Sequence, residues 1–229
     1  ATVDHRCATR EVATVVRFNG GAQAAHNVVV DGVHRTGRLF GAGTLSGTPT
    51  FLAAPTLLDP AALLAEAEEL VRLGVPDPFA LLTVDPEALV TTEIHRAANR
   101  TREDLRGDGR HGSCAMGIGE TTWFDLACRA GLGSGERLGN FAAPADAPAH
   151  ALRVRDLRDR ATVTARLVEL ERFYHPLLAR GRHEVPHLRR LADELLDVGR
   201  LLRTAPAAPH LASAEERGVV VAEGAQGVL

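Results

Sequence analysis

The stretch VVRFNGGAQAAHNVVVDG, residues 15–32, sets two apolar β-branched runs on either side of a short loop with paired glycines and one histidine. Continuous apolar runs of this kind are typical of strands that are buried on both faces, as they are in parallel sheets. We therefore expect strands at residues 14–18 and 27–32, with the loop between them at one end of a buried sheet. This arrangement favours an α/β fold.

The rest of the chain continues the alternation of apolar runs and helical periodicity. Residues 59–74 predict a helix, because Asp59 is a favourable N-cap, Pro60 fits the first turn and Gly74 ends the pattern. We expect a central, mostly parallel sheet with flanking helices and a helical insertion. Strands are expected near the end of residues 37–58 and at 80–85, 88–93 and 219–223; helices at 95–107, within 107–135, and at 155–181 and 183–205; and linkers at 140–151 and 205–218.

Length and composition are those of a chain with a sizeable core. It has 229 residues, of which 45% are hydrophobic, and we expect a single α/β domain over residues 1–229. A formal net charge of −3, without clusters of basic and aromatic residues, argues against nucleic acid as a partner. No apolar run approaches the ~20 residues that span a bilayer, and the first residues lack a signal-peptide pattern. We therefore expect no membrane partner and a cytoplasmic location.

Cysteine and lysine usage adds two constraints. Cys7, Cys114 and Cys128 lie at scattered spacings, which fits a reducing compartment better than a disulfide framework. All 26 basic residues are arginine, so neither a phosphate-loop lysine nor a Schiff-base lysine can come from this sequence.

Three glycine-containing loops are candidates for ligand binding, because open α/β sheets bind ligands where strands end. In residues 19–27, glycines let the backbone approach a ligand, Gln23 can donate and accept hydrogen bonds, and His26 can act as a proton donor. Residues 109–120 precede a helix N-terminus that can hold an anion. Gln226 follows the expected last strand. A lone loop histidine is also commonly structural or solvated, and the residues alone leave that choice open.

Cys114 and His111 offer a different interpretation, a cysteine nucleophile activated by a histidine in an unrelated α/β enzyme. Residues so close in sequence rarely adopt the geometry of such a pair. Thiol chemistry at Cys114 is therefore kept as an alternative.

Taken in chain order, the candidate segments resemble the adenylosuccinate synthetase family, and the resemblance runs through nearly the whole chain. Its most specific parts are the GGxxxxH loop and the final GAQG. Members of this family join aspartate to the 6-position of inosine monophosphate with GTP and Mg²⁺, and their fold is related to that of P-loop NTPases. The segments are VVRFNGGAQAAHNVVVDG (15–32), GAGTL (41–45), DPAALLAEAEEL (59–70), GSCAMGIGE (112–120) and VVVAEGAQGVL (219–229).

The resemblance implies roles for the residues of the first loop. In the family, GTP phosphorylates the 6-oxo group of the purine, and the aspartate amine then displaces the phosphate. A histidine at the place of His26 acts as an acid toward the developing oxyanion and contacts the GTP phosphates. Ala25 stands where a backbone carbonyl helps to hold Mg²⁺, and Gln23 stands where an asparagine contacts the nucleotide. Ala24 and Asn27 complete the implied nucleotide-binding loop.

The resemblance also implies nucleotide contacts elsewhere, with departures from the family pattern. Gln226 matches a glutamine that touches the nucleotide. Ser113 and Cys114 replace two threonines that bind the nucleotide phosphate, and Met116 replaces an arginine. Arg129 lies next to the position of an arginine that reaches the neighbouring subunit's nucleotide in family homodimers. These departures favour a second hypothesis, a ligase for a guanine nucleotide in a 2-aminoadenylosuccinate-like reaction or for a secondary-metabolite substrate.

The two ends of the sequence carry their own expectations. The family's Gly-Asp-x-Gly-Lys-Gly phosphate loop, with its base aspartate, would lie directly before Ala1, and the loops that bind aspartate and guanine would follow Leu229. We therefore expect a partial chain of a GTP-dependent C–N ligase whose substrates are a purine nucleotide and aspartate. A catalytically silent nucleotide-binding homologue is the alternative from another class.

Overall fold

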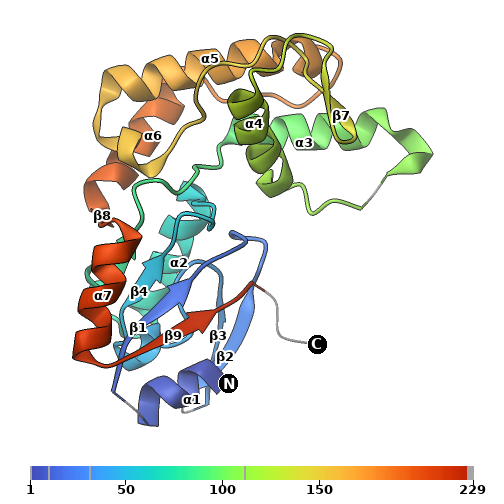
Figure 1. Cartoon of the computed structure of the whole chain (residues 1–229). Helices are drawn as coiled ribbons and strands as arrows, with labels where there is room; N and C mark the ends of the chain where they lie inside the picture. Colours follow the sequence, from blue (N-terminus) through green and yellow to red (C-terminus); the bar gives the residue numbers. More distant parts are fainter. Residues whose placement is uncertain (1, 10, 31, 111, 226–229) are drawn as a thin grey trace. The chain divides into compact units, whose positions relative to one another are not determined.

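The chain forms two compact units, shown in Figure 1 with colours that follow the sequence. The sheet unit contains Ala1–Ala88 and Val198–Leu229, and the helical unit contains Leu89–Asp197. The residues that this computed structural model describes are 2–9, 11–30, 32–110 and 112–225.

The sheet unit is built on a five-stranded sheet with the strand order β8-β5-β4-β1-β9. Every neighbouring pair in this sheet is parallel. The predicted α/β class with a central parallel sheet is therefore confirmed. The strands are β1 (Val12–Arg17), β4 (Thr50–Leu52), β5 (Leu82–Val84), β8 (Arg203–Thr204) and β9 (Val219–Glu223). The unit also contains helix α1 (Thr2–Thr9) and short 3-10 helices at Thr44–Ser46 and Pro78–Leu81.

Helix α2 (Pro60–Arg72) forms where the sequence predicts it. Asp59 accepts a hydrogen bond from the Ala62 N–H at 3.1 Å, and Pro60 occupies the first turn. The apolar face of the helix is buried. Local capping signals therefore locate the start of this helix correctly.

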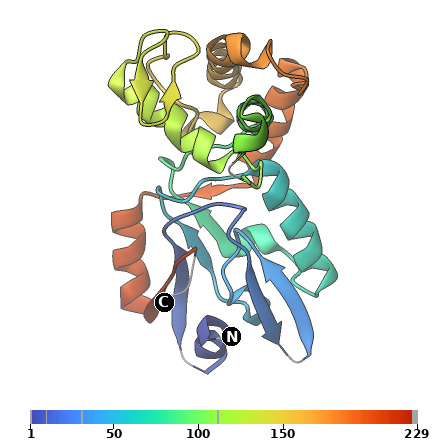
Figure 2. The ribbon, with the colours of Figure 1, turned by 90° about the vertical axis from the view of Figure 1, so that its right-hand side faces the viewer.

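Helix α7 (Ala207–Arg217) lies on the side of the sheet opposite to α2, as Figure 2 shows. Leu211 of this helix packs against the buried Val16 and Phe51 of the sheet. The linker predicted at residues 205–218 is therefore wrong. Proline is compatible with the start of a helix, and a few apolar side chains suffice to cover one face of a sheet. A segment rich in proline and alanine can therefore form a helix, although its composition resembles that of a linker.

The second predicted strand exists, but it does not join the central sheet. β2 (His26–Val30) pairs antiparallel with β3 (Val33–Gly37) in a separate hairpin. A parallel neighbour needs a crossover of about a dozen residues or more, and only residues 18–25 separate β1 from β2. A tight turn between Val30 and Val33 folds the chain back on itself instead.

The helical unit contains the helices predicted as an insertion in the α/β fold. The strand predicted at residues 88–93 does not form, because Leu89 makes only an isolated bridge to Arg153 and Thr92 is already the N-cap of the next helix. The elements are α3 (Glu93–Leu105), α4 (Ile118–Ala130), β6 (Arg137–Leu138), β7 (Phe141–Ala142), α5 (Arg160–Leu178) and α6 (Leu188–Leu201), with 3-10 helices at Gly107–Gly109 and Val154–Arg158.

An aromatic cluster forms the core of the helical unit. The ring centroids of Phe124, Phe173 and Tyr174 lie between 4.9 and 5.7 Å apart. His95 packs edge-on against Phe124 and Tyr174, and its Nδ1 accepts a hydrogen bond from the Thr92 N–H at 3.1 Å. Burial lowers the pKa of His95 to about 3, so the ring is neutral at physiological pH and serves the core and the helix cap.

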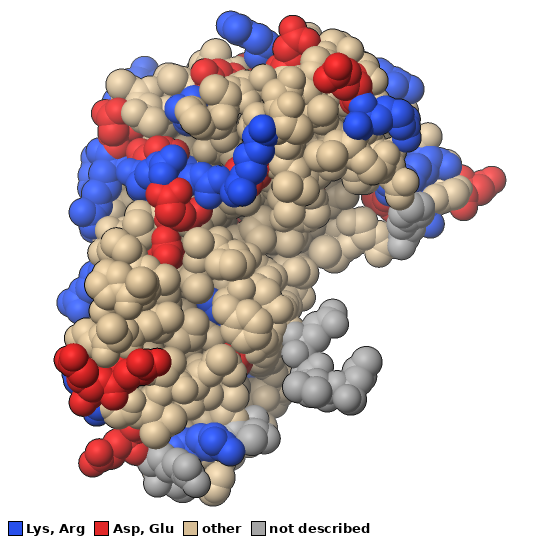
Figure 3. All heavy atoms as spheres, viewed as in Figure 1, with Lys and Arg blue, Asp and Glu red and all other residues tan. Residues whose placement is uncertain are grey.

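Charged side chains of both signs lie on the surface of the helical unit. Figure 3 shows acidic and basic side chains next to one another over this part of the molecule. Arg160 lies 2.7 Å from Asp193, and Arg190 lies 2.8 Å from Glu194. Within the described part of the chain, no helix is both long enough and apolar enough to cross a membrane.

Candidate functional site

The candidate site lies where the carboxyl ends of β1 and β9 meet. These strands are parallel neighbours, with Arg17 opposite Glu223, so the segments that follow them lie side by side. Gly20 makes the close approach possible. It has a φ of +73°, and a Cβ at this position would lie only 2.6 Å from the Ala225 Cβ. The chain therefore forms a crevice at a strand end, the usual place for a ligand in such sheets.

A pocket of about 380 Å³ lies at this meeting point. The Ala225 N–H donates to Asn19 Oδ1 at 2.6 Å, which ties the two segments together. The structure thus brings together two of the three loops predicted to bind ligands, although Gln226 itself lies outside the described residues. The pocket lining comes from both segments and consists of Asn19, Gln23, Ala24, Ala25 and Ala225.

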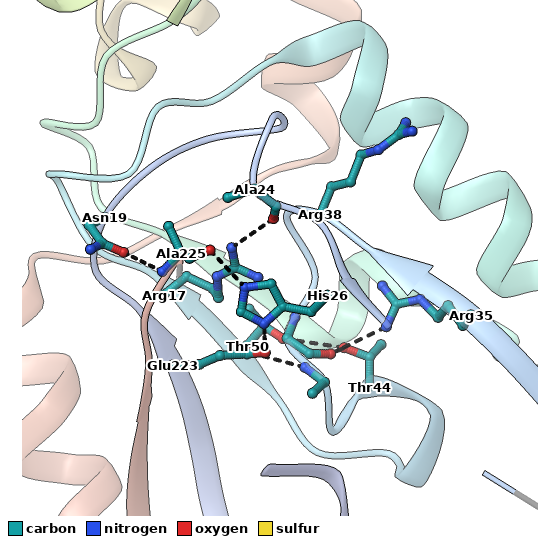
Figure 4. A network of polar contacts seen from close by, with 12 residues as sticks. Arg17, Asn19, Ala24, His26, Arg35, Arg38, Thr44, Thr50, Glu223 and Ala225 are labelled. Atoms are coloured by element: carbon teal, nitrogen blue, oxygen red, sulfur yellow. Dashed lines mark hydrogen bonds and ion pairs between the residues drawn. The ribbon is translucent and has the colours of Figure 1, made fainter. Parts of the chain in front are cut away.

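His26 is the first residue of β2 and stands beside this pocket, held at both ring nitrogens (Figure 4). Its Nδ1 lies 2.8 Å from Glu223 Oε1, and its Nε2 lies 3.3 Å from the Ala225 carbonyl oxygen. The other Glu223 oxygen, Oε2, accepts the Ala42 N–H at 3.1 Å. The Glu223 side chain is 3% exposed and that of His26 is 23% exposed, so the ring joins a buried carboxylate to the accessible surface.

Both partners of the His26 ring are hydrogen-bond acceptors. An ionised carboxylate and a carbonyl oxygen only accept hydrogen bonds. A neutral imidazole has one N–H, whereas an imidazolium has two and can donate to Glu223 and Ala225 together. Both ring nitrogens of His26 therefore face hydrogen-bond acceptors, as a proton-donating ring requires.

Arg17 lies under the same loop and is 1% exposed. Its Nη2 donates to the Ala24 carbonyl at 3.4 Å, whereas its Nε and Nη1 have no hydrogen-bond partner among the described residues. Burial lowers the pKa of Arg17, and the Glu223 carboxylate opposes that effect. Glu223 therefore interacts with both His26 and Arg17.

The hairpin that carries His26 is anchored to α2 by a buried ion pair. Arg35 of β3 contacts Glu66 of α2, and both side chains are almost fully buried. Glu66 also accepts the backbone N–H groups of Arg38 at 2.9 Å and Leu39 at 2.7 Å. The end of the hairpin is thus fixed to the helix by several bonds to one carboxylate.

Gly41 lets the next segment approach β1. A Cβ on Gly41 would lie 2.9 Å from Val15 Cγ1 and 3.0 Å from Thr50 Oγ1, so no larger residue fits without a shift. This close approach places the neighbouring Ala42 N–H against Glu223. Small residues in the predicted GAGTL segment therefore help to hold the carboxylate that contacts His26.

Asn27, like His26, is a predicted contact of the first loop that is not part of the pocket lining. Its Oδ1 accepts the Thr36 hydroxyl at 3.1 Å, across the β2–β3 hairpin. Its side chain therefore stabilises the hairpin in this structure.

The remaining predicted residues belong to the helical unit. Ser113 and Cys114 line a pocket of about 230 Å³ together with Asn99, Glu103 and other residues. The Ser113 hydroxyl donates to Asn99 Oδ1 at 3.0 Å. Arg129 is not part of this lining, and it pairs with Asp125 one turn earlier on α4 at 2.8 Å.

Charged groups around the second pocket are paired with one another. Arg106 contacts Glu103, and Arg102 lies 2.9 Å from Glu120. The Arg102 guanidinium also lies 4.7 Å from the Phe141 ring centroid. The arginines near the Ser113–Cys114 segment are therefore already neutralised by carboxylates.

The two cysteines of α4 and its preceding loop differ in accessibility. Cys114 is exposed, whereas Cys128 is buried, and burial raises the pKa of Cys128 to about 12. Cys128 is therefore protonated at neutral pH. His111, the suggested partner of Cys114, lies outside the described residues.

Sequence reasoning missed Glu223 and Arg17 as parts of the site. Each is a charged residue at the end of an otherwise apolar strand that the structure buries. Buried charges are rare unless they are paired, so a charge at the last position of an apolar run is a signal that could have found them.

Comparison with known proteins identifies a family. A model of adenylosuccinate synthetase matches residues 2–229. A protein named adenylosuccinate synthetase from Alkalilimnicola ehrlichii is 30% identical over 234 residues, covering 96% of this chain and 47% of the relative. One of the same name from Thermoplasma volcanium is 30% identical over 219 residues, covering 94% of this chain and 45% of the relative. The chain thus spans about half the length of these relatives.

Solved structures support the same fold. The structure of fully ligated adenylosuccinate synthetase from Plasmodium falciparum superposes with a TM-score of 0.71 at 18% identity, covering 93% of this chain and 45% of that one. The two structures share the α/β fold with its parallel sheet. Since the family model extends over residues 2–229, this chain belongs to the adenylosuccinate synthetase family.

Proposed function

We propose that this chain is part of a GTP-dependent C–N ligase that joins aspartate to the 6-position of a purine nucleotide through a 6-phosphoryl intermediate. The observation that carries the proposal is His26, held 2.8 Å from the buried Glu223 at the rim of a pocket between two strand ends. Membership of the family supports the reaction class.

His26 is proposed as the catalytic acid. GTP transfers its γ-phosphoryl group to the purine 6-oxygen and leaves as GDP, and the aspartate amine then attacks C6 and displaces inorganic phosphate. Negative charge grows on oxygens during phosphoryl transfer. An imidazolium at His26, prearranged by its acceptors, offsets that charge without reorganisation at the moment of reaction.

The pocket residues are proposed to bind nucleotide. Gln23 provides an amide that can donate and accept, and Ala24 and Ala25 line the same pocket with small side chains. Mg²⁺ in nucleotide enzymes is held by one or two protein ligands together with substrate phosphates, and the Ala25 carbonyl on the pocket lining fits as such a ligand. The ion would neutralise phosphate charge when bound.

The other predicted contacts remain part of the proposal. Ser113, Cys114 and Gln226 are proposed to bind the nucleotide, and Arg129 is proposed to act across a homodimer interface. Its pairing with Asp125 would have to be exchanged for a nucleotide phosphate. We also propose a cytoplasmic location, as for an enzyme of purine biosynthesis.

A second candidate is a ligase for a different nucleotide. The pocket beside Ser113 and Cys114 has its arginines paired with Glu103 and Glu120, and the family arginine is replaced by Met116. Because these arginines are paired and Met116 carries no charge, we expect this pocket to bind the usual nucleotide phosphate more weakly. A guanine nucleotide in a 2-aminoadenylosuccinate-like reaction or a secondary-metabolite substrate is therefore the second hypothesis, and a silent nucleotide-binding protein is the third.

The deciding experiment uses the full-length protein that carries this chain. Inosine, guanosine and deoxyguanosine monophosphates are each offered with aspartate, GTP and Mg²⁺, and released phosphate and the condensed product are measured. Product with one of them identifies the ligase and its nucleotide. Nucleotide binding without product supports the silent homologue, and full activity after alkylation of Cys114 excludes thiol catalysis.

His26→Ala tests the assigned acid in the same assay. We expect turnover to fall by at least about 100-fold, because the proton donor to the developing oxyanion is lost, with nucleotide affinity changed much less. The matched control is His34→Ala, which removes an exposed imidazole from the other strand of the same hairpin. Unchanged turnover in His26→Ala would refute the role.

A further inference from the structure

Glu223 is fixed more firmly than a surface carboxylate. It is the last residue of β9, opposite Arg17 in the parallel ladder with β1. Its Oε2 accepts the Ala42 N–H at 3.1 Å, and its Oε1 lies 2.8 Å from His26 Nδ1. Three separate segments therefore determine where this carboxylate lies.

The two contacts of the His26 ring are unequal. The contact of Nδ1 is short and joins the ring to an acid, whereas Nε2 lies 3.3 Å from the neutral carbonyl of Ala225. Charge-assisted hydrogen bonds are roughly twice as strong as neutral ones. Ala225 also lines the pocket, so a ligand that enters can take over the Nε2 contact while Nδ1 stays on Glu223 (Figure 4).

We propose that Glu223 is the positioning residue of His26: it holds Nδ1 in its protonated form and leaves Nε2 as the nitrogen that donates to the reacting phosphoryl group. This inference rests on the proposed ligase function. It assigns a role to a residue of the last strand, which the candidate motifs did not include. A carboxylate that orients a histidine in this way fixes both the tautomer and the direction of the ring.

Arg17 is a second group, besides His26, on which the negative charge of Glu223 acts. Arg17 is almost fully buried, leaves two N–H groups without hydrogen-bond partners among the described residues, and interacts electrostatically with Glu223. Glu223→Gln would keep the size of the side chain but remove the negative charge that acts on Arg17 and faces His26 Nδ1. An amide in its place can present an N–H group to Nδ1, so Nδ1 would no longer be fixed as the nitrogen that carries the proton.

The test removes the negative charge of residue 223 and keeps the size of its side chain. In the full-length protein, Glu223→Gln is expected to lower kcat on the order of 100-fold, with KM for the nucleotide within about threefold of wild type. Glu223→Asp retains the charge on a shorter side chain and is expected to recover part of the lost kcat. Glu216→Gln, an exposed position on α7, is the control and is expected to behave as wild type.

A spectroscopic measurement separates positioning from general damage. Long-range ¹H–¹⁵N spectra of the 229-residue chain report the protonation of each imidazole, and the His26 signals are those that disappear in His26→Ala. In the wild type we expect a proton on Nδ1. In Glu223→Gln we expect the protons to be distributed differently between Nδ1 and Nε2. Glu216→Gln, which removes an exposed carboxylate of the same unit, is expected to leave the His26 nitrogen shifts in place.

Each outcome decides one question. An active enzyme in which Glu223→Gln keeps wild-type kcat, or unchanged His26 ring signals in that variant, overturns the positioning role. A full-length wild type that forms no product overturns the ligase function, while the ring spectra still decide whether Glu223 holds His26. If Glu223→Gln does not fold, the ring signals of the wild type decide the question, and an Nδ1 without a proton in the wild type overturns the role.

Discussion

Two histidines of this chain, His95 and His26, differ in burial and in the polar groups around their rings. His95 lies in the aromatic core, where its ring packs against Phe124 and Tyr174 and burial is the cause of its lowered pKa. His26 is partly exposed, and a buried carboxylate faces its Nδ1. The cost of removing a charge from water keeps the first ring neutral, whereas the second ring has a buried carboxylate and nearby solvent as polar partners.

His95 is expected to make the stability of the fold depend on pH. Its pKa is lowered from 6.5 to about 3 by burial, so between these values the unfolded chain binds a proton that the native chain does not. The free energy of unfolding therefore falls as the pH decreases through this window, by up to about 1.4 kcal/mol per pH unit from this group. Urea unfolding between pH 7 and 4 measures the slope.

The matched variant is His95→Gln, because a glutamine at the third helical position can still accept the N-cap N–H and does not titrate in this range. We expect the slope to decrease relative to the wild type, whatever the variant's stability at pH 7. His34→Gln removes an exposed histidine and serves as the control. An equal slope in the wild type and His95→Gln would show that His95 is not buried as the structure describes.

At the scale of elements, the β2–β3 hairpin depends on helix α2 for its position. Glu66 of α2 contacts Arg35 and accepts two backbone N–H groups at the end of the hairpin. A buried ion pair gives little net stability compared with apolar residues, but it is costly to break. The carboxylate therefore fixes one arrangement of the hairpin, and with it the position of His26.

Glu66→Leu is expected to lower the free energy of unfolding by about 3–5 kcal/mol, because it leaves the buried Arg35 charge without its partner. The double variant Arg35→Met with Glu66→Leu removes both charges and is expected to recover much of the loss. Chemical denaturation followed by circular dichroism measures all three proteins. A double variant that is less stable than Glu66→Leu alone would contradict this account.

Elements with local signals were predictable, and elements defined by their partners were not. Helix α2 has its cap, its proline and its apolar face within one short segment, and it forms where predicted. β2 has the composition of a buried parallel strand, yet the short connection from β1 and the tight turn after Val30 give an antiparallel hairpin. Helix α7 was not predicted, because it is stabilised by packing against a face of the sheet, and this contact does not show in the local sequence.

At the scale of the whole molecule, the two units differ in how the chain builds them. The helical unit is one continuous segment, whereas the sheet unit needs both ends of the sequence. β9 and β8, which follow the helical unit in the chain, complete the sheet that β1, β4 and β5 begin. Formation of the central sheet therefore requires contacts between residues that are far apart in sequence.

We predict that residues 89–201, which include the whole of α6, fold on their own. Their aromatic core is internal, and Trp123, the only tryptophan in the sequence, is buried there. Its fluorescence is expected to be blue-shifted and to move to longer wavelength in a single urea transition. Residues 1–88 alone lack β8 and β9 and are expected to show no cooperative transition by circular dichroism. A fragment 89–201 with the emission of exposed tryptophan would contradict the prediction.

The sequence by itself determined the fold class, helix α2, the strands β1 and β9, and the loop that contains His26, because capping signals, apolar runs and ordered motifs are local properties of the chain. Only the tertiary structure decided that Glu223 contacts His26, that Arg17 lies buried beside them, and that the loop after β1 meets Ala225 in one pocket. The physical reason is strand order. Parallel pairing of β1 with β9 brings two distant strand ends together, and no local pattern encodes which strands become neighbours.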